Sequence, residues 1–219
     1  IPAKPLPIYL QIAELLARQI KAGYWRVGER LPTEAEMSET LNVAVGTLRK
    51  SLALLSDQGV LERKQGSGTY VKQVAGTQQI YELFRLELHT GPGLPTAHIL
   101  DVCKLARPTY VPVFGSNPTS KVWRVRRLRF LSQVPAALEE IWFDASDCPV
   151  LTAADLGDSM YLFYQERFGT WISRVEDHVS AAPSPTWSLP PYGRLADEYA
   201  GFIERTSWTA TNTIAEFSQ

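Results

Sequence analysis

The stretch of residues 31–71, LPTEAEMSETLNVAVGTLRKSLALLSDQGVLERKQGSGTYV, decides the fold of the N-terminal part of this chain. It opens with a capping box, in which the Thr33 hydroxyl accepts from the amide of Glu36 and the Glu36 carboxylate reaches back to the amide of Thr33. This pattern predicts a short helix from residue 33 to about residue 41. After a short turn, 3-4-3 spacing predicts a second helix with Val45, Leu48, Leu52 and Leu55 on one stripe.

A hairpin is expected directly after the second helix. Gly59 follows Asp57 and Gln58 at the position where a left-handed helix cap is cheapest. Two short apolar segments, 60–63 and 69–71, then flank a basic tip that contains two glycines. A helix-turn-helix followed by a basic hairpin is a winged helix, which offers one helix to the DNA major groove and the hairpin to the backbone or minor groove.

Four short motifs in fixed order carry a resemblance to a known family. They are RLPTE at 30–34, GTLRKSL at 46–52, GVL at 59–61 and GSGTYV at 66–71. Together they resemble the DNA-binding domain of the GntR family of bacterial regulators, over residues 5–72. One departure is Ala44-Val45, where the family usually carries Ser-Arg, so an arginine with a DNA contact is absent here.

The charge distribution agrees with a DNA-binding head. Residues 1–75 carry ten basic and seven acidic residues, and the remainder carries twelve and sixteen. Because the excess is small, we expect a homodimer that doubles the contacts to double-stranded operator DNA. The residues expected to contact DNA lie at the head of the first predicted helix, on the second helix and on the wing: Glu34, Thr47, Arg49, Lys50, Lys64, Gln65, Gly66, Ser67, Gly68 and Thr69.

Composition restricts the class of protein. Of the 219 residues, 45% are hydrophobic and 11% aromatic, which is typical of a packed globular protein. There is no apolar run of 18 residues, so we expect no membrane span. Two cysteines are too few for a disulfide framework and favour a reduced, cytoplasmic protein. The chain begins without Met or an apolar signal core, which indicates a trimmed start.

A second domain is expected after a linker. We predict a winged helix over residues 1–73, an uncharged linker over 74–79 and a second domain over 80–219. Aromatic and β-branched content predicts strands at 80–88, 121–131, 135–143, 171–181 and 201–208. Helical windows at 152–158, 159–168 and 193–199 separate them, so the second domain is predicted to be α+β around an antiparallel sheet.

Two arginines in the strand at 121–131 share one face. Pairing residue 129 with residue 137 places Glu139 opposite Arg127, and Arg129 projects on the same side. One interpretation is a weak cross-strand ion pair on a solvated sheet face. The other is a pocket in which the guanidinium groups hold a carboxylate or phosphate while Glu139 binds a hydroxyl or amine.

A second resemblance bears on this choice. RLR at 127–129, LE at 138–139 and AEFS at 215–218 resemble the UTRA domain, the effector-binding domain of the HutC-like branch of the GntR family. The resemblance implies a fold like that of chorismate lyase and a small-molecule effector such as a sugar phosphate, a carboxylate or an amino-acid-derived metabolite. It implies effector contacts by Arg127, Arg129, Glu139 and Glu216. Other members have a tyrosine-bearing segment beyond residue 218, so we expect this chain to stop short of it.

The leading hypothesis is a dimeric transcriptional regulator, expected to be a repressor, whose operator binding responds to a small anionic metabolite. The alternative is an enzyme that acts on a small acid through the lyase-like domain, although the sequence contains no nucleophile with an adjacent base. The three histidines fit no metal motif, and we expect no cofactor. An aromatic cage for a quaternary ammonium ligand is a further alternative, from Trp123, Trp142 and Trp171.

Overall fold

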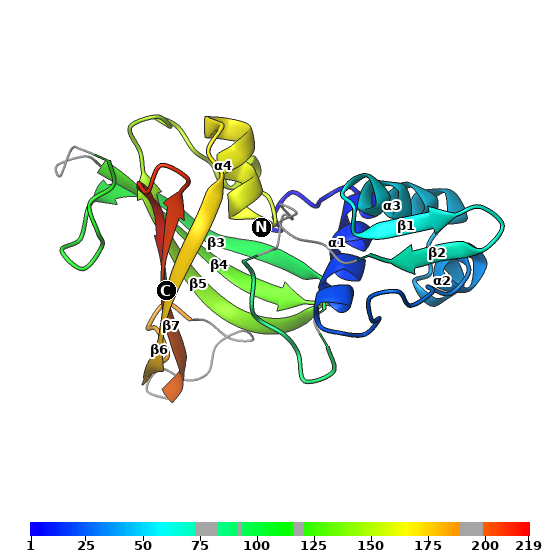
Figure 1. Cartoon of the computed structure of the whole chain (residues 1–219). Coiled ribbons are helices and arrows are strands. Elements are labelled where there is room, and N and C mark those ends of the chain that lie inside the picture. The colour runs from blue at the N-terminus through cyan, green and yellow to red at the C-terminus, as the bar shows by residue number, and fades with distance from the viewer. Residues whose placement is uncertain (73–82, 92, 116–120, 189–198) are drawn as a thin grey trace. The chain divides into compact units, whose positions relative to one another are not determined.

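The computed structural model describes residues 1–72, 83–91, 93–115, 121–188 and 199–219 (Figure 1). The chain divides into two compact units, one of Leu6–Leu94 and one of Ile1–Pro5 together with Pro95–Gln219. The expected linker at 74–79 lies outside the described residues, and the boundaries at 73 and 80 stay predictions. In the part of the chain that is described, no helix has the length and apolar character needed to cross a membrane.

The first unit is the predicted winged helix. Helices α1 (Ile8–Lys21), α2 (Glu34–Thr40) and α3 (Val45–Asp57) precede the antiparallel hairpin of β1 (Leu61–Lys64) and β2 (Gly68–Val71). Its core is apolar and includes Ile12, Leu16, Leu48, Leu52, Leu55 and Leu61. Of the predicted stripe, Leu48, Leu52 and Leu55 are buried, whereas Val45 at the start of α3 is 38% exposed. Helical side chains tilt toward the N-terminus, so that of the first residue projects beyond the packed turns.

The second unit is the predicted α+β domain with an antiparallel sheet. Its six strands are β3 (Pro95–Ala106), β4 (Lys121–Leu131), β5 (Val134–Asp144), β6 (Ile172–Pro183), β7 (Tyr199–Thr209) and β8 (Ile214–Ser218). They lie in the order β3-β4-β5-β8-β7-β6. The expected strands at 121–131, 135–143, 171–181 and 201–208 are thereby confirmed, and helix α4 (Met160–Phe168) confirms the window at 159–168.

Three expected elements differ. Residues 83–88 form no strand, only an isolated bridge between Leu88 and Gly91, and 80–82 lie outside the described residues. The window at 152–158 contains only the short 3₁₀ helix η1 (Ala153–Asp155), and the window at 193–199 is described only at Tyr199, which begins β7. Strand β3 was not predicted, because a bulge between Ile99 and Asp101 interrupts the alternation of buried and exposed residues.

The two faces of the sheet have different covers. Helix α4 packs on one face, where the rings of Phe143 and Tyr164 have centroids 5.4 Å apart. On the other face, Val111 and Phe114 from the segment after β3 join a buried cluster with Trp142 and Phe217. Since neighbouring residues of a strand point to opposite faces, each strand supplies two separate sets of side chains.

The β4–β5 hairpin fixes the register of the sheet. Ser132 and Gln133 both have positive φ, 46° and 69°, as a tight two-residue hairpin turn requires. Next to the turn Leu131 pairs with Val134, and a register shift between Arg129 and Phe130 then gives the pairs Arg129 with Ala137 and Arg127 with Glu139, which are the pairs that were predicted.

Candidate functional site

The start of α2 is held by the predicted capping box. The amide of Thr33 donates to Oε2 of Glu36 over 2.7 Å, and the amide of Glu36 donates to the Thr33 hydroxyl over 3.3 Å. These backbone and side-chain hydrogen bonds with Thr33 lower the pKa of Glu36. The cap therefore fixes the backbone of the first helical turn, which carries Glu34.

Glu34 lies between two arginines from different elements. Nε of Arg49 in α3 is 2.8 Å from its Oε2, and Nη2 of Arg63 in β1 is 3.7 Å from its Oε1. Nη2 of Arg63 also donates to the carbonyl oxygen of Arg49 over 3.3 Å. The structure thus brings Glu34 and Arg49 together and adds Arg63, which was not predicted. A basic side chain next to Lys64 in the wing is the sequence signal for it.

The other two predicted residues of α3 have different surroundings. Thr47 is half-buried, and Lys50 is exposed. Nζ of Lys50 lies 5.1 Å from the centre of the Tyr9 ring in α1. Such a cation–π contact at an exposed site contributes about 0.5–1 kcal/mol, so a phosphate can compete for this ammonium group.

The wing presents a glycine-containing tip. Gly66 and Gly68 have φ of +72° and +126°, which L side chains rarely adopt. A Cβ at Gly68 would lie 2.6 Å from Nε of Arg30, whose side chain would have to move. At the tip, the predicted wing residues Lys64, Gln65, Gly66 and Ser67 are exposed. At the start of β2, Gly68 and Thr69 are half-buried.

Tyr70 supports this tip from β2. Nζ of Lys64 lies 4.7 Å from the centre of its ring, and its hydroxyl is 2.7 Å from Oγ of Ser67. Lys64 also lies 3.7 Å from Glu62. The wing lysine is therefore held in place while its side chain remains half exposed.

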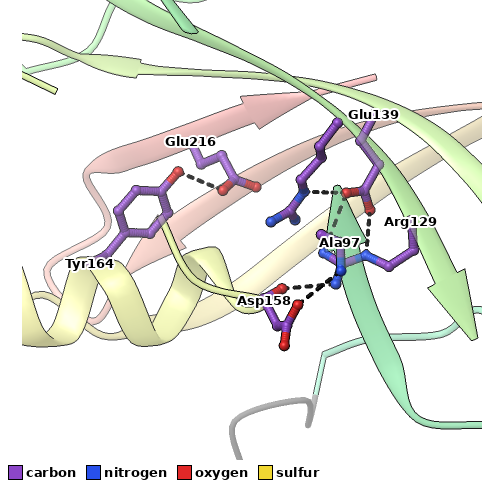
Figure 2. A network of polar contacts seen from close by, with 7 residues as sticks. Ala97, Arg129, Glu139, Asp158, Tyr164 and Glu216 are labelled. Carbon is purple, nitrogen blue, oxygen red and sulfur yellow. Dashed lines mark hydrogen bonds and ion pairs between the residues drawn. The ribbon is translucent and has the colours of Figure 1, made fainter. Parts of the chain in front are cut away.

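The second group of predicted residues lies on the α4 face of the sheet (Figure 2). Nε of Arg127 donates to Oε2 of Glu139, and Nε and Nη2 of Arg129 lie 3.3 Å from Oε1 and Oε2 of the same carboxylate. Arg127 is 5% exposed and Arg129 is 2% exposed. The interpretation as an ion pair on a solvated face is therefore wrong, because this face is buried.

The ionisable groups of this cluster differ in how fully their charges and hydrogen-bonding atoms are compensated. Burial opposes ionisation of Glu139, but the charges of Arg127 and Arg129 outweigh it and lower the pKa of Glu139 to about 2. Burial and the charge of Arg129 lower the pKa of Arg127. Within the described part of the chain, Nη1 of Arg127 is buried without a hydrogen-bond partner. A buried donor of this kind is costly, and an acceptor oxygen of a ligand would satisfy it.

Glu216 of β8 lies close to this cluster. Its Oε2 accepts a hydrogen bond of 2.7 Å from the Tyr164 hydroxyl of α4 (Figure 2). Burial raises the pKa of Glu216, against the hydrogen bond from Tyr164 and the charge of Arg127. Burial and the charge of Glu216 raise the pKa of Tyr164. The structure thus brings all four predicted effector residues into one buried region, and adds Tyr164.

Asp158 is a further polar residue that was not predicted. It is 3% exposed, directly before the residue that caps α4. Its carbonyl oxygen accepts from Nη1 of Arg129 over 2.8 Å, and its Oδ1 accepts from the amide of Ala97 over 2.8 Å (Figure 2). An acidic residue before a helix-capping Ser159 is the sequence signal, but its partners follow only from the tertiary structure.

The opposite face of the sheet carries separate ion pairs. Nε of Arg126 is 2.6 Å from Oε2 of Glu140, and Nη2 of Arg124 is 2.6 Å from Oδ2 of Asp101. A cavity of about 490 Å³ is lined on this side by residues that include Tyr110 and Phe217. It does not include the four predicted effector residues, which point to the other face.

The two weaker candidates from the sequence were an aromatic cage and a metal site. Trp123 and Trp142 are 6% and 2% exposed and lie on opposite faces of the sheet, so they form no common cage. Among the residues that the structure describes, no group of three or more His, Cys, Asp or Glu side chains could hold a metal ion.

Comparison with known families agrees with both the winged helix and the sheet domain. Residues 8–71 match the family of bacterial regulatory proteins called gntR, and residues 95–219 match the UTRA domain. The chain belongs to the GntR family. It is a transcriptional regulator of the branch that carries a UTRA effector-binding domain, and not an enzyme.

Curated relatives of this GntR regulator are themselves regulators. It is 44% identical to the HTH-type transcriptional regulator SmoD of Agrobacterium fabrum, over 97% of this chain and 90% of SmoD. It is 32% identical to MngR of Escherichia coli, the repressor of a mannosyl-D-glycerate transport and metabolism system, over 79% of this chain and 73% of MngR.

A solved structure shares the fold of the second domain. It is the ligand-binding domain of a protein described as a GntR-family regulator from Bordetella bronchiseptica, with a TM-score of 0.50 and 18% identity. The match covers 57% of this chain and 80% of that domain. The α+β architecture of the GntR regulator is therefore shared, while its ligand has to be inferred from its own residues.

Proposed function

We propose that this regulator is a homodimeric, cytoplasmic repressor that is released from its operator by a small anionic metabolite rich in hydroxyl groups. The DNA-binding surface in this proposal consists of Glu34, Arg49, Arg63, Thr47 and Lys50 with the wing tip at residues 64–69. Its support is the meeting of α2, α3 and β1 at one carboxylate.

The observation that carries the effector proposal is the unpartnered Nη1 of Arg127. This donor is buried among the described residues, beside a carboxylate that already binds Arg127 and Arg129. A carboxylate or phosphate oxygen at Nη1 would gain a charge-assisted hydrogen bond. Glu216 and Tyr164 would then face hydroxyl groups of the same ligand, because a buried carboxyl and phenol bind hydroxyls well.

The name of one relative indicates a chemical class for the effector. MngR acts on a system for mannosyl-D-glycerate, which combines a sugar with a carboxylate. A glycosyl carboxylate or a sugar phosphate would offer one anionic end to Arg127 and Arg129 and several hydroxyls to the opposite side. We therefore propose this class ahead of amino-acid-derived acids.

Calorimetry on matched arginine variants tests the proposal. The probes are mannosyl-D-glycerate, a hexose 6-phosphate and an amino-acid-derived carboxylic acid. Arg127→Lys keeps the charge but removes the guanidinium fork, so affinity for the true class should fall by about 10- to 100-fold. Arg126→Lys is the control, because Arg126 binds Glu140 on the opposite face. Equal affinity in both variants would place the effector elsewhere.

A further inference from the structure

The first residues of the chain pack against the sheet domain. Residues Ile1–Pro5, called the strap here, belong to the same compact unit as Pro95–Gln219. The amide of Ile99 donates to the carbonyl of Ile1 over 2.8 Å, and the amide of Ala3 donates to the carbonyl of Ala97 over 2.9 Å. The strap therefore pairs with β3, the strand at one edge of the sheet.

The strap has a second attachment just before α4. The amide of Lys4 donates to the carbonyl of Leu156 over 3.0 Å, and Lys4 forms a parallel bridge with Gly157. Ala3 between these contacts is 5% exposed. The strap is thus held on one side by β3 and on the other by residues 156–157.

Asp158 joins both attachments to the effector cluster. It directly follows Gly157, its carboxylate accepts from the amide of Ala97, and its carbonyl accepts from Nη1 of Arg129. Figure 2 shows the hydrogen bonds that join Asp158 to both Arg129 and Ala97. A displacement of the Arg129 guanidinium would therefore act on Asp158. This residue is bonded to Ala97 at the first attachment of the strap and is adjacent to Gly157 at the second.

The strap continues directly into the DNA-binding unit. Only Leu6 and Pro7 separate it from α1, which begins at Ile8. Pro5 and Pro7 have restricted φ and no amide hydrogen, and Pro7 is extended with φ −50° and ψ 137°. The first turn of α1 is in turn bonded to α3, because Oγ of Ser51 donates to the carbonyl of Tyr9 over 2.8 Å. Along the chain, few residues therefore separate the strap from a helix that is bonded to α3.

We propose that the strap is a second link, besides the segment that follows the wing, through which effector binding acts on the winged helix, and that Asp158 is the positioning residue that couples the two. This inference rests on the proposed function, which places the effector at Arg127 and Arg129. An effector that takes over hydrogen bonds of Arg129 changes the contact with Asp158. The strap transmits that change because Ala97 is bonded both to Ala3 and to Asp158, and because Gly157, which bridges to Lys4, directly precedes Asp158.

Hydrogen exchange without effector or DNA tests the physical link. In Asp158→Ala, the amides of Ala3 and Lys4 should exchange about tenfold faster or more, because local opening becomes easier. Asp155→Ala is the matched control, since Asp155 is an exposed carboxylate that receives the Thr152 amide and touches neither Ala97 nor Arg129. Equal exchange at Ala3 and Lys4 in the two variants would overturn the role of Asp158.

Operator binding with and without effector tests the coupling. Lys4→Pro removes the amide that donates to Leu156, whereas Lys4→Ala keeps it. With saturating mannosyl-D-glycerate, or a hexose 6-phosphate as second probe, the effector-induced change in operator Kd should shrink about fivefold or more in Lys4→Pro only. Probe affinity for the DNA-free protein should stay within about threefold of wild type, because the backbone bonds of the strap go to Ala97, Ile99 and Leu156 and not to Arg127 or Arg129.

The outcomes separate the two proposals. An unchanged effector response in Lys4→Pro would overturn the strap as a link. If neither probe binds the wild-type protein, the proposed effector class fails instead, and the exchange comparison still decides whether Asp158 holds the strap.

Discussion

Glu34 at the head of α2 and Arg49 on α3 form an ion pair, with 2.8 Å between Oε2 and Nε. Both side chains are partly exposed, 32% and 61%, so the pair contributes at most about 1 kcal/mol to stability. Its importance lies in the orientation that it gives the Arg49 side chain. The carboxylate orients the guanidinium at the surface that we propose binds DNA.

Removal of the Arg49 side chain should weaken operator binding. Arg49→Ala should cost about 1–3 kcal/mol in operator affinity, because a base or phosphate contact is lost. Arg49→Lys is the matched control that keeps the charge but not the planar fork, and it should recover binding to random DNA more than binding to operator. Gel-shift titrations with both duplexes measure this, and an Arg49→Ala protein that equals wild type would contradict the docking.

Removal of the Glu34 carboxylate should have the opposite effect on random DNA. In Glu34→Ala, Arg49 and Arg63 lose their shared anion, and phosphates meet one less negative charge. Random DNA should bind a few-fold more tightly, with a salt slope about one unit steeper. The ratio of operator to random affinity should fall because Arg49 is less well oriented. A constant ratio over a salt titration would remove the orienting role from Glu34.

Lys64 on the wing should contribute the same amount for every sequence. It carries no base-reading fork, and its ammonium is held over Tyr70 at the tip. Lys64→Ala should weaken operator and random DNA alike and lower the salt slope by about one unit. Fluorescence anisotropy over a range of salt concentrations gives the slope, and an unaltered value would place Lys64 away from phosphates.

Glu139 should make the fold sensitive to acid. Its pKa is lowered from 4.5 to about 2, so its contribution is present above pH 4.5 and is lost as pH falls toward 2. This shift corresponds to about 3 kcal/mol, which Glu139→Gln should remove at pH 7. Urea unfolding at pH 7, 4.5 and 3 should show the difference from wild type shrinking with acid. Glu140→Gln on the other face should leave that acid-dependent loss in place.

Glu216 should have the opposite pH dependence. Its pKa is raised by burial, so the protonated form favours folding and stability is lost as pH rises through the folded-state pKa. Glu216→Gln should remove this loss and gain stability relative to wild type as the pH rises above the ordinary carboxyl pKa of 4.5. Tyr164→Phe takes away the hydroxyl donor and should steepen the wild-type trend. A stability difference between Glu216→Gln and wild type that is independent of pH would contradict this assignment.

The winged helix could be predicted because its signals are local. The capping box at Thr33 and Glu36 and the positive φ of Gly59 and Gly66 depend on residues a few positions apart. The pairing of Arg127 with Glu139 was also predicted, but it depends on more than the turn, because a register shift between Arg129 and Phe130 is needed to bring Arg127 opposite Glu139 instead of Leu138.

Other features depend on distant parts of the chain. The bulge in β3 removed the alternation that would have marked it as a strand. Asp158 and Tyr164 acquire their roles only when α4 packs on the sheet and meets Arg129 and Glu216. That Arg127 and Arg129 are buried rather than solvated likewise follows from this packing, which the strand's own sequence does not contain.

The position of β8 in the sheet has a consequence for the order in which the protein gains its abilities during translation. The strand that carries Glu216 follows the other five strands of the sheet along the chain, yet it lies between β5 and β7 inside the sheet. The winged helix is complete within Leu6–Leu94, and domains generally fold as units from the N-terminus. A nascent or truncated chain can therefore form its DNA-binding head long before it can form its sensor. Loss of β8 alone should therefore leave a protein that still binds DNA but no longer responds to a metabolite.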